Sequence, residues 1–327
     1  MDSQSKMRDS PGKVPQSRSD RGDNIEFEWL NKESGCPTSK LQRKPEMQIE
    51  RNTAEIEGQP LHYLRAGSGS PLLLLHGLLG GAFCWRLNVD ALSRRHTVFA
   101  VDLPGLGACD APRHLDCSMT AQARRLLSLL EQLELERVDV VGSSWGGAIA
   151  MFLAAQSRRV RSLVLAAPVN PWSDFGAGRI RFLKGRLGAA LLRLAWPVSR
   201  PLHRIAVERM YGDPRCIPAG TIEGYSSLAT RPGKVHSVLN TLRSWEDDVN
   251  ALGKAIPRIT VPSLLIWGTR DGAVDLRSAE HLRRALPASE LKLIEGAGHL
   301  PFEETPDEFN RLVLDFVERT RAQSGSA

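Results

Sequence analysis

The chain contains the sequence VDVVGSSWGG at residues 138–147, an apolar run that leads into two serines and three glycines. This pattern indicates a buried strand, then Gly-x-Ser-x-Gly, then a helix that starts with small residues at 148–150. A serine hydroxyl is a weak nucleophile, and a tight strand-to-helix turn exposes it where a base can reach it. The spacing selects Ser144 over Ser143, because Ser144 alone stands between glycines at both required positions, Gly142 and Gly146.

A second apolar run, residues 72–75, ends in His76 and Gly77 and continues into a loop with further glycines at 80 and 81. A backbone N–H at such a strand end can help to bind an oxyanion. We expect the N–H groups of Leu78 and of Trp145, at the start of the helix after Ser144, to be the two donors. An ordinary glycine turn after a buried strand is the alternative.

Two further side chains follow apolar runs near the carboxyl end of the chain. Asp271 comes after the run at 263–267, and His299 comes after the run at 291–294. Loops past the carboxyl ends of parallel strands are where such sheets place their sites. We therefore expect His299 to be the general base and Asp271 to fix its tautomer. Asp275 and, less favoured, Asp248 are the alternative acids.

The periodicity along the chain predicts an α/β fold with a doubly wound, mostly parallel sheet. Strands are expected at 61–65, 72–75, 98–101, 138–141, 163–166, 264–267 and 291–294. Helices are expected at 121–133, 146–155, 276–285 and 306–321. Residues 1–46 are polar and predict a disordered N-terminal extension. Residues 47–168 and 246–322 form the predicted core, and residues 169–245 form a predicted helical insertion over one end of the sheet.

The composition is that of a globular protein, with 42% hydrophobic and 24% charged residues. The net charge is +6, but residues 179–209 hold eight Lys or Arg against one acid, so this segment carries +7 and the remainder −1. A local basic segment does not favour nucleic-acid binding. The first 20 residues lack the apolar stretch of a secretory signal, so a cytoplasmic location is expected. No two of the five cysteines form a CxxC pair, so no zinc site is expected.

The basic segment also has a helical pattern. Apolar residues recur at spacings of three and four, which predicts a stripe that packs on the core; they are Ile180, Leu183, Leu187, Leu191 and Leu194. Arg179, Arg186 and Arg193 fall on another side. The preferred interpretation is a solvated cationic face. Attraction of an anionic substrate and contact with an anionic membrane are the alternatives, and membrane contact is not favoured by the sequence.

Taken in order, the motifs resemble those of the α/β-hydrolase superfamily over residues 47–320. They are His76-Gly77, Asp102-Leu103-Pro104-Gly105, Gly142-Ser143-Ser144-Trp145-Gly146, Trp267-Gly268-Thr269-Arg270-Asp271 and Gly298-His299. The resemblance implies an eight-stranded sheet, a helical cap formed by the insertion, a structural role for Asp102, and a mechanism without a cofactor or metal. Haloalkane dehalogenases and epoxide hydrolases of this fold use an aspartate nucleophile, where this chain has Ser144.

These expectations lead to one preferred function. The chain is expected to cleave a carboxylic ester or a related acyl bond of a small molecule, anionic or lipophilic, through an acyl-enzyme on Ser144. A C–C bond hydrolase or an acyltransferase would use the same three residues. A non-catalytic binding protein of this fold is the alternative from another class. The Gly-x-Ser-Trp-Gly pattern is similar to that of proline iminopeptidases, but residues 76–79 read HGLL where those enzymes have HGGPG.

Overall fold

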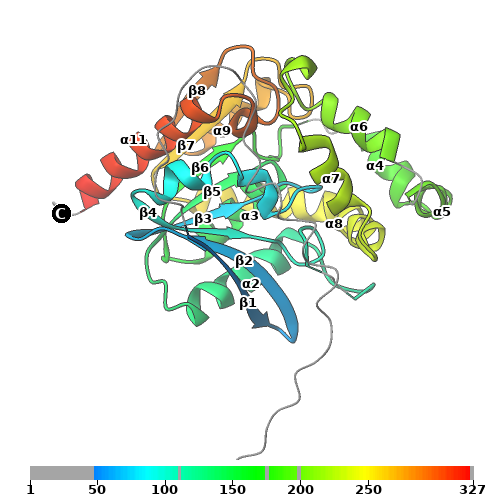
Figure 1. Ribbon diagram of the computed structural model, residues 1–327, viewed down its shortest axis with the longest axis horizontal. Helices are drawn as coiled ribbons and strands as arrows, with labels where there is room; N and C mark the ends of the chain where they lie inside the picture. Colours follow the sequence, from blue (N-terminus) through cyan, green and yellow to red (C-terminus); the bar gives the residue numbers. More distant parts are fainter. Residues whose placement is uncertain (1–47, 110–111, 174–176, 197–199, 325–327) are drawn as a thin grey trace, which may run out of the picture. The chain divides into compact units, whose positions relative to one another are not determined.

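The computed structural model describes residues 48–109, 112–173, 177–196 and 200–324, and the predicted extension at 1–46 lies outside them. Eight strands form one sheet in the order β1-β2-β4-β3-β5-β6-β7-β8 (Figure 1). They are β1 (Ile49–Ile56), β2 (Gln59–Ala66), β3 (Ser70–Leu75), β4 (His96–Val101), β5 (Val138–Ser143), β6 (Val160–Ala166), β7 (Ser263–Gly268) and β8 (Ser289–Ile294). The pairs β1–β2 and β2–β4 are antiparallel, and all others are parallel. The predicted fold class is confirmed.

Helices follow the strands and cover both faces of the sheet. Those of the core are α1 (Val89–Ser93), α2 (Met119–Gln132), α3 (Trp145–Gln156), α9 (Arg277–Ala285), α10 (Pro301–Glu304) and α11 (Pro306–Ser324), with the short 3-10 turn η2 (Ala82–Trp85). Helix α2 begins at Met119, two residues before the predicted start, and Ser118 caps it, because the Ser118 side chain accepts a hydrogen bond from the N–H of Ala121. No helix in the described part of the chain is both long and apolar enough to cross a membrane.

The core lies on both sides of the parallel strands. All four leucines of β3, residues 72–75, have no exposed surface. Leu73 and Leu75 belong to the same hydrophobic cluster as α2 and α3, and strand geometry turns Leu72 and Leu74 to the opposite face. Burial on both faces explains why these strands read as continuous apolar runs rather than as alternating ones.

Strand β1 is the one strand that residue patterns did not predict. It pairs with β2 through a two-residue turn in which Glu57 (φ 54°) and Gly58 (φ 70°) both have positive φ, the geometry that suits a tight hairpin. As an edge strand it buries only Ala54 and Ile56. Its sequence, IERNTAEI, therefore has no apolar run to detect.

Between β6 and β7 the chain forms a helical segment instead of a strand. It contains α4 (Ala177–Lys184), α5 (Arg186–Ala195), α6 (Arg200–Glu208), α7 (Thr221–Ala229) and α8 (Lys234–Ala255), with the 3-10 turns η4 (Pro214–Cys216) and η5 (Ile256–Arg258). The expected boundary at residue 246 falls inside α8, so that helix begins in the predicted insertion and ends in the predicted core.

The predicted apolar stripe on this segment is wrong in its second half. The predicted single helix is interrupted at Gly185, so Ile180 and Leu183 lie on α4 and the three remaining leucines lie on α5. Ile180 is buried, whereas Leu187, Leu191 and Leu194 are exposed. Helix α5 instead turns Gly188 and Ala189 inward. A Cβ on Gly188 would lie 2.1 Å from the carbonyl oxygen of Phe182, so α5 packs closely on the end of α4 through its smallest residue.

Candidate active site

Ser144 lies at the sharp turn between β5 and α3, with φ 51° and ψ −117°. Such a conformation costs a non-glycine residue about 1–3 kcal/mol and persists only where the surroundings enforce it. A Cβ on Gly142 would lie 2.7 Å from the oxygen of Gly146, and a Cβ on Gly146 would lie 2.4 Å from the oxygen of His76. Ser144 is half-buried and Ser143 is buried. The turn thus exposes the hydroxyl of Ser144 and buries that of Ser143.

Backbone hydrogen bonds hold this turn in place. The N–H of Ser144 donates to the oxygen of Ala166 at the end of β6 (2.9 Å), and its carbonyl accepts from Val169 (3.0 Å) and Gly147 (3.1 Å). Trp145 is the first residue of α3, and the first N–H groups of a helix have no partner inside it. The start of α3 therefore offers backbone N–H groups and the positive end of the helix dipole beside the Ser144 hydroxyl.

His299 and Asp271 are in direct contact. The distance between His299 Nδ1 and Asp271 Oδ2 is 2.9 Å, and the two side chains are 5% and 0% exposed. The other carboxylate oxygen, Oδ1, accepts from the N–H groups of Ala273 (2.7 Å) and Val274 (2.9 Å), which fixes the carboxylate plane. Because a carboxylate accepts, Nδ1 of His299 carries the proton and Nε2 keeps a free lone pair.

The sheet order places all three residues at one edge. Ser144, Asp271 and His299 follow the carboxyl ends of β5, β7 and β8, with only β6 between β5 and β7. The alternative acids lie elsewhere. Asp275 makes an ion pair with exposed Arg277, and buried Asp248 accepts from the N–H of Met119 at the start of α2. Burial raises the pKa of Asp248 to about 6.

His76 organises the loop after β3. Its Nε2 accepts a hydrogen bond from the N–H of Leu103 (2.9 Å), so the neutral ring carries its proton on Nδ1 and donates it to the oxygen of Gly77 (2.7 Å). Full burial lowers the pKa of His76 to about 4, which keeps the ring neutral at physiological pH. The function of this histidine is thus to hold a backbone carbonyl.

The same contact orients the N–H of Leu78. The oxygen of Gly77 also accepts from the N–H of Gly80 (3.1 Å), so that carbonyl points into the turn. Across a trans peptide the following N–H points the opposite way, which directs the N–H of Leu78 out of the turn. A Cβ on Gly77 would lie 3.8 Å from Ser144 Oγ, so this peptide is beside the hydroxyl.

The helical segment contacts the His299 loop directly. The N–H of His299 donates to the oxygen of Met210 (2.6 Å), just after α6. Glu304 then bridges the two parts: Oε2 accepts from the N–H of Gly212 (2.8 Å) and Oε1 accepts from the N–H of Gly298 (2.8 Å). Burial raises the pKa of Glu304, partly offset by these N–H donors. Glu304 therefore fixes the position of the loop that carries His299.

A buried charge cluster lies next to Glu304. Glu303 is fully buried and accepts from Arg86 (2.8 Å), Tyr211 (2.8 Å) and Tyr225 (2.6 Å). Burial raises the pKa of both tyrosines, so each hydroxyl keeps its proton and donates. This cluster joins η2 and α10 of the core to α7 of the helical segment. The sequence pattern did not single out Glu303 or Glu304. The one local signal that could have indicated them is two adjacent acids directly after the apolar residues 300–302.

Two more contacts attach α8 to the core. The rings of Trp145 and Trp245 stack with centroids 4.8 Å apart. Lys234, which is buried, donates to the carbonyl oxygens of Leu106 and Gly107.

Asp102 accepts from two backbone N–H groups, those of Ala82 (2.9 Å) and Ala108 (2.8 Å), which is the structural function that the resemblance implied.

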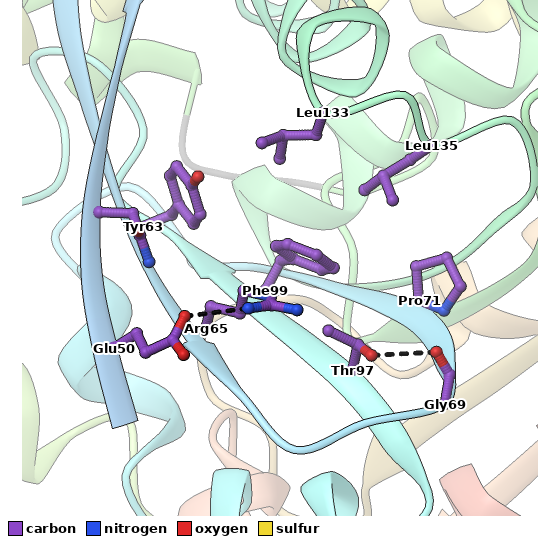
Figure 2. Close-up of a pocket in the computed structure, with 10 residues that line it drawn as sticks. Glu50, Tyr63, Arg65, Gly69, Pro71, Thr97, Phe99, Leu133 and Leu135 are labelled. Carbon is purple, nitrogen blue, oxygen red and sulfur yellow. Dashed lines mark hydrogen bonds and ion pairs between the residues drawn. The ribbon is translucent and has the colours of Figure 1, made fainter. Parts of the chain in front are cut away.

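A separate cavity of about 410 Å³ lies at the other end of the strands (Figure 2). It is lined by residues near the starts of β3 and β4, including Pro71 and Thr97, and by the Glu50–Arg65 ion pair (3.0 Å). A strand of six residues is about 17 Å long, so this cavity lies about a strand length from Ser144. Among the described residues, no three metal-binding side chains gather into a cluster.

Comparison with known proteins agrees with the fold described above. A family model described as alpha/beta hydrolase fold matches residues 70–306. An uncharacterized protein of Mycobacterium tuberculosis is 32% identical over 81% of this chain and 80% of that protein. The 2-hydroxy-6-oxo-2,4-heptadienoate hydrolase of Pseudomonas putida is 28% identical over 77% of this chain and 90% of that enzyme. A solved epoxide hydrolase without ligand superposes with a TM-score of 0.73 at 27% identity, over 83% of this chain and 99% of that one. The chain therefore belongs to the α/β-hydrolase fold family.

Proposed function

We propose that the protein is a serine hydrolase that cleaves a carboxylic ester or a related acyl bond through an acyl-enzyme on Ser144. The observation that carries the proposal is the pairing of His299 Nδ1 with Asp271 Oδ2 at 2.9 Å, at the same sheet edge as the strained, accessible Ser144. Strain at a turn and a buried His–Asp pair are each costly to keep, and together they suit one chemistry.

The reaction proceeds in two halves. Ser144 Oγ forms a bond to the substrate carbonyl carbon while His299 Nε2 takes its proton, and Asp271 stabilises the resulting imidazolium. The tetrahedral oxyanion accepts from the N–H groups of Leu78 and Trp145. The C–O bond to the alcohol then breaks, and the alcohol leaves with the proton from Nε2. Water activated by Nε2 attacks the acyl-enzyme in the same way and releases the acid.

The orientation of the Leu78 N–H supports its function in this scheme. The His76 and Gly80 contacts direct it out of its turn, next to Ser144. Removing one oxyanion donor has cost about 2.7–4 kcal/mol of transition-state stabilisation in an enzyme where it was measured. A preset donor needs no rearrangement as the negative charge develops.

The similar proteins leave two reaction types to compare with ester hydrolysis. Epoxide hydrolases of this fold use an aspartate nucleophile, and Ser144 instead favours acyl chemistry. C–C bond hydrolysis is the second candidate, because a relative at 28% identity has a name of that kind. That reaction would use the same three residues, so the substrate distinguishes them.

The test is a panel of p-nitrophenyl esters of increasing acyl length, with a 2-hydroxy-6-oxo-dienoate as the C–C substrate. Ser144→Ala should lower kcat by roughly 10⁵–10⁶-fold on whichever substrate is cleaved. Ser143→Ala, which removes the neighbouring buried hydroxyl, is the matched control and should retain most activity. Activity of Ser144→Ala close to that of the wild type would end the proposal, and cleavage of the dienoate alone would select the second candidate.

A further inference from the structure

The helices α4, α5 and α6 carry most of the exposed apolar side chains of the described chain. In the described part of the chain eight large apolar side chains are exposed, and six of the eight lie on these three helices. We call this set the apolar face; it consists of Phe182, Leu187, Leu191, Leu194, Leu202 and Ile205. Figure 1 shows these helices, in green, away from the strands. Six exposed apolar side chains on three consecutive helices are more than the single, scattered apolar residues of an ordinary surface, and this concentration favours an interaction surface.

The packing of α5 causes this exposure. Leu187, Leu191 and Leu194 are spaced four and three residues apart, so they form one stripe, and they are 67%, 49% and 78% exposed. The inward stripe holds Gly188 and Ala189. Since a Cβ on Gly188 would lie 2.1 Å from the oxygen of Phe182, no larger residue fits there. The helix is therefore held with its leucines toward solvent, and it cannot rotate to bury them without losing this close contact.

The same helices are strongly basic. Residues 179–209 contain eight Lys or Arg and a single acid, Glu208. Two of the cations pair with carboxylates, Lys184 with Glu246 and Arg204 with Glu208, both at 2.7 Å. Within the described residues, exposed Arg186 and Arg193 make no ion pair. Their charge is therefore available to a partner.

We propose that the apolar face docks on the surface of an anionic lipid bilayer. Short helices that combine a leucine row with arginines, and that have almost no acids, have the composition of interfacial helices. Leucines would enter the boundary of the acyl chains, and Arg186 and Arg193 would bind lipid phosphates. A second copy of the chain is a poor occupant, because each copy would bring residues 179–209, with a formal net charge of +7, into the interface. This proposal does not depend on the proposed hydrolysis.

The test is co-sedimentation of the full chain with vesicles of phosphatidylcholine alone and with vesicles that also contain phosphatidylglycerol. The wild type should bind the anionic vesicles, and added salt should weaken the binding. Arg186→Gln with Arg193→Gln should weaken it about 30-fold, at about fivefold for each charge lost near an anionic surface. Leu187→Ser with Leu194→Ser should weaken it about tenfold or more for each leucine removed.

The control variant combines Arg158→Gln with Leu293→Ser, which changes an exposed arginine and an exposed leucine outside the three helices. It should bind as the wild type does. Because all four test positions are exposed, each variant should keep the wild-type melting temperature. Failure of the wild type to sediment with phosphatidylglycerol vesicles would overturn the proposal. Equal binding by the wild type and both variants, or a dimer that the leucine variant dissociates, would do so as well.

Discussion

The buried Glu303 cluster yields a prediction whose size follows from the structure. In Glu303→Gln the side chain keeps its shape but loses its charge. Arg86, whose side chain is 7% exposed, then lacks a counter-charge in the interior. The two carboxylate oxygens accept from Tyr211, Tyr225 and Arg86, and an amide nitrogen in place of one of them cannot accept. At least one of these donors loses its partner.

Removing one partner of a buried ion pair costs about 3–5 kcal/mol, because the remaining charge stays desolvated. For a domain of this size, about 2–4 °C of melting temperature corresponds to each kcal/mol, so Glu303→Gln should lower the Tm by roughly 6–20 °C. Differential scanning calorimetry measures this shift. The control is Glu308→Gln on α11, where the glutamate is exposed and should contribute little.

The double variant Arg86→Met, Glu303→Gln tests the physical reason. It removes the stranded cation, so it should recover part of the stability that Glu303→Gln loses. A melting temperature of Glu303→Gln within about 2 °C of the wild type would refute the reasoning, since water would then reach the cluster. Additive destabilisation would refute it as well: in that case the double variant would be less stable than Glu303→Gln by the whole free-energy cost of Arg86→Met.

Three other predictions concern the site. Glu304→Gln should lower kcat by roughly 10–100-fold with little change in KM, because the loop that carries His299 shifts. A changed KM with an unchanged kcat would contradict this prediction. Asp271→Asn should lower kcat by about 10⁴-fold, as in an enzyme with this His–Asp contact, while Asp275→Asn should keep the wild-type kcat. Equal losses of kcat in the two variants would contradict the assignment of Asp271 as the acid that pairs with His299. Since burial lowers the folded pKa of His76 to about 4 from 6.5, the unfolded chain binds its proton first. Stability is then full above pH 6.5 and falls toward pH 4, and urea titrations should show less of this fall in His76→Gln.

Much of the fold could be predicted because its signals are local. Strand β5 and the turn at Ser144 are specified by a buried apolar run and by two glycines, Gly142 and Gly146, at which a Cβ would lie only 2.4–2.7 Å from neighbouring backbone oxygens. Strand β1 was not predicted, because an edge strand buries few residues and so shows no apolar run. The exposure of the α5 leucines was not predicted, because apolar spacing alone does not tell which side of a helix faces the core. That choice depends on how closely Gly188 approaches α4, a tertiary contact.

The site shows the same division. Asp271 and His299 could be predicted because each follows a short apolar run that reads as a strand, β7 or β8, and the parallel pairing of these strands aligns their carboxyl ends. The contact of Met210 with His299 and the bridge through Glu304 could not. Both join residues about ninety positions apart, and both involve backbone groups, which every residue possesses and no sequence pattern marks.

The central claim is that Ser144 is the nucleophile and that His299 activates it. Labelling with a fluorophosphonate, followed by mass spectrometry of the digested protein, tests it directly. We predict one adduct, on the peptide that contains Ser144, which is absent in Ser144→Ala and forms far more slowly in His299→Ala. An adduct that persists in Ser144→Ala, or a folded wild type that takes up no label, would contradict it.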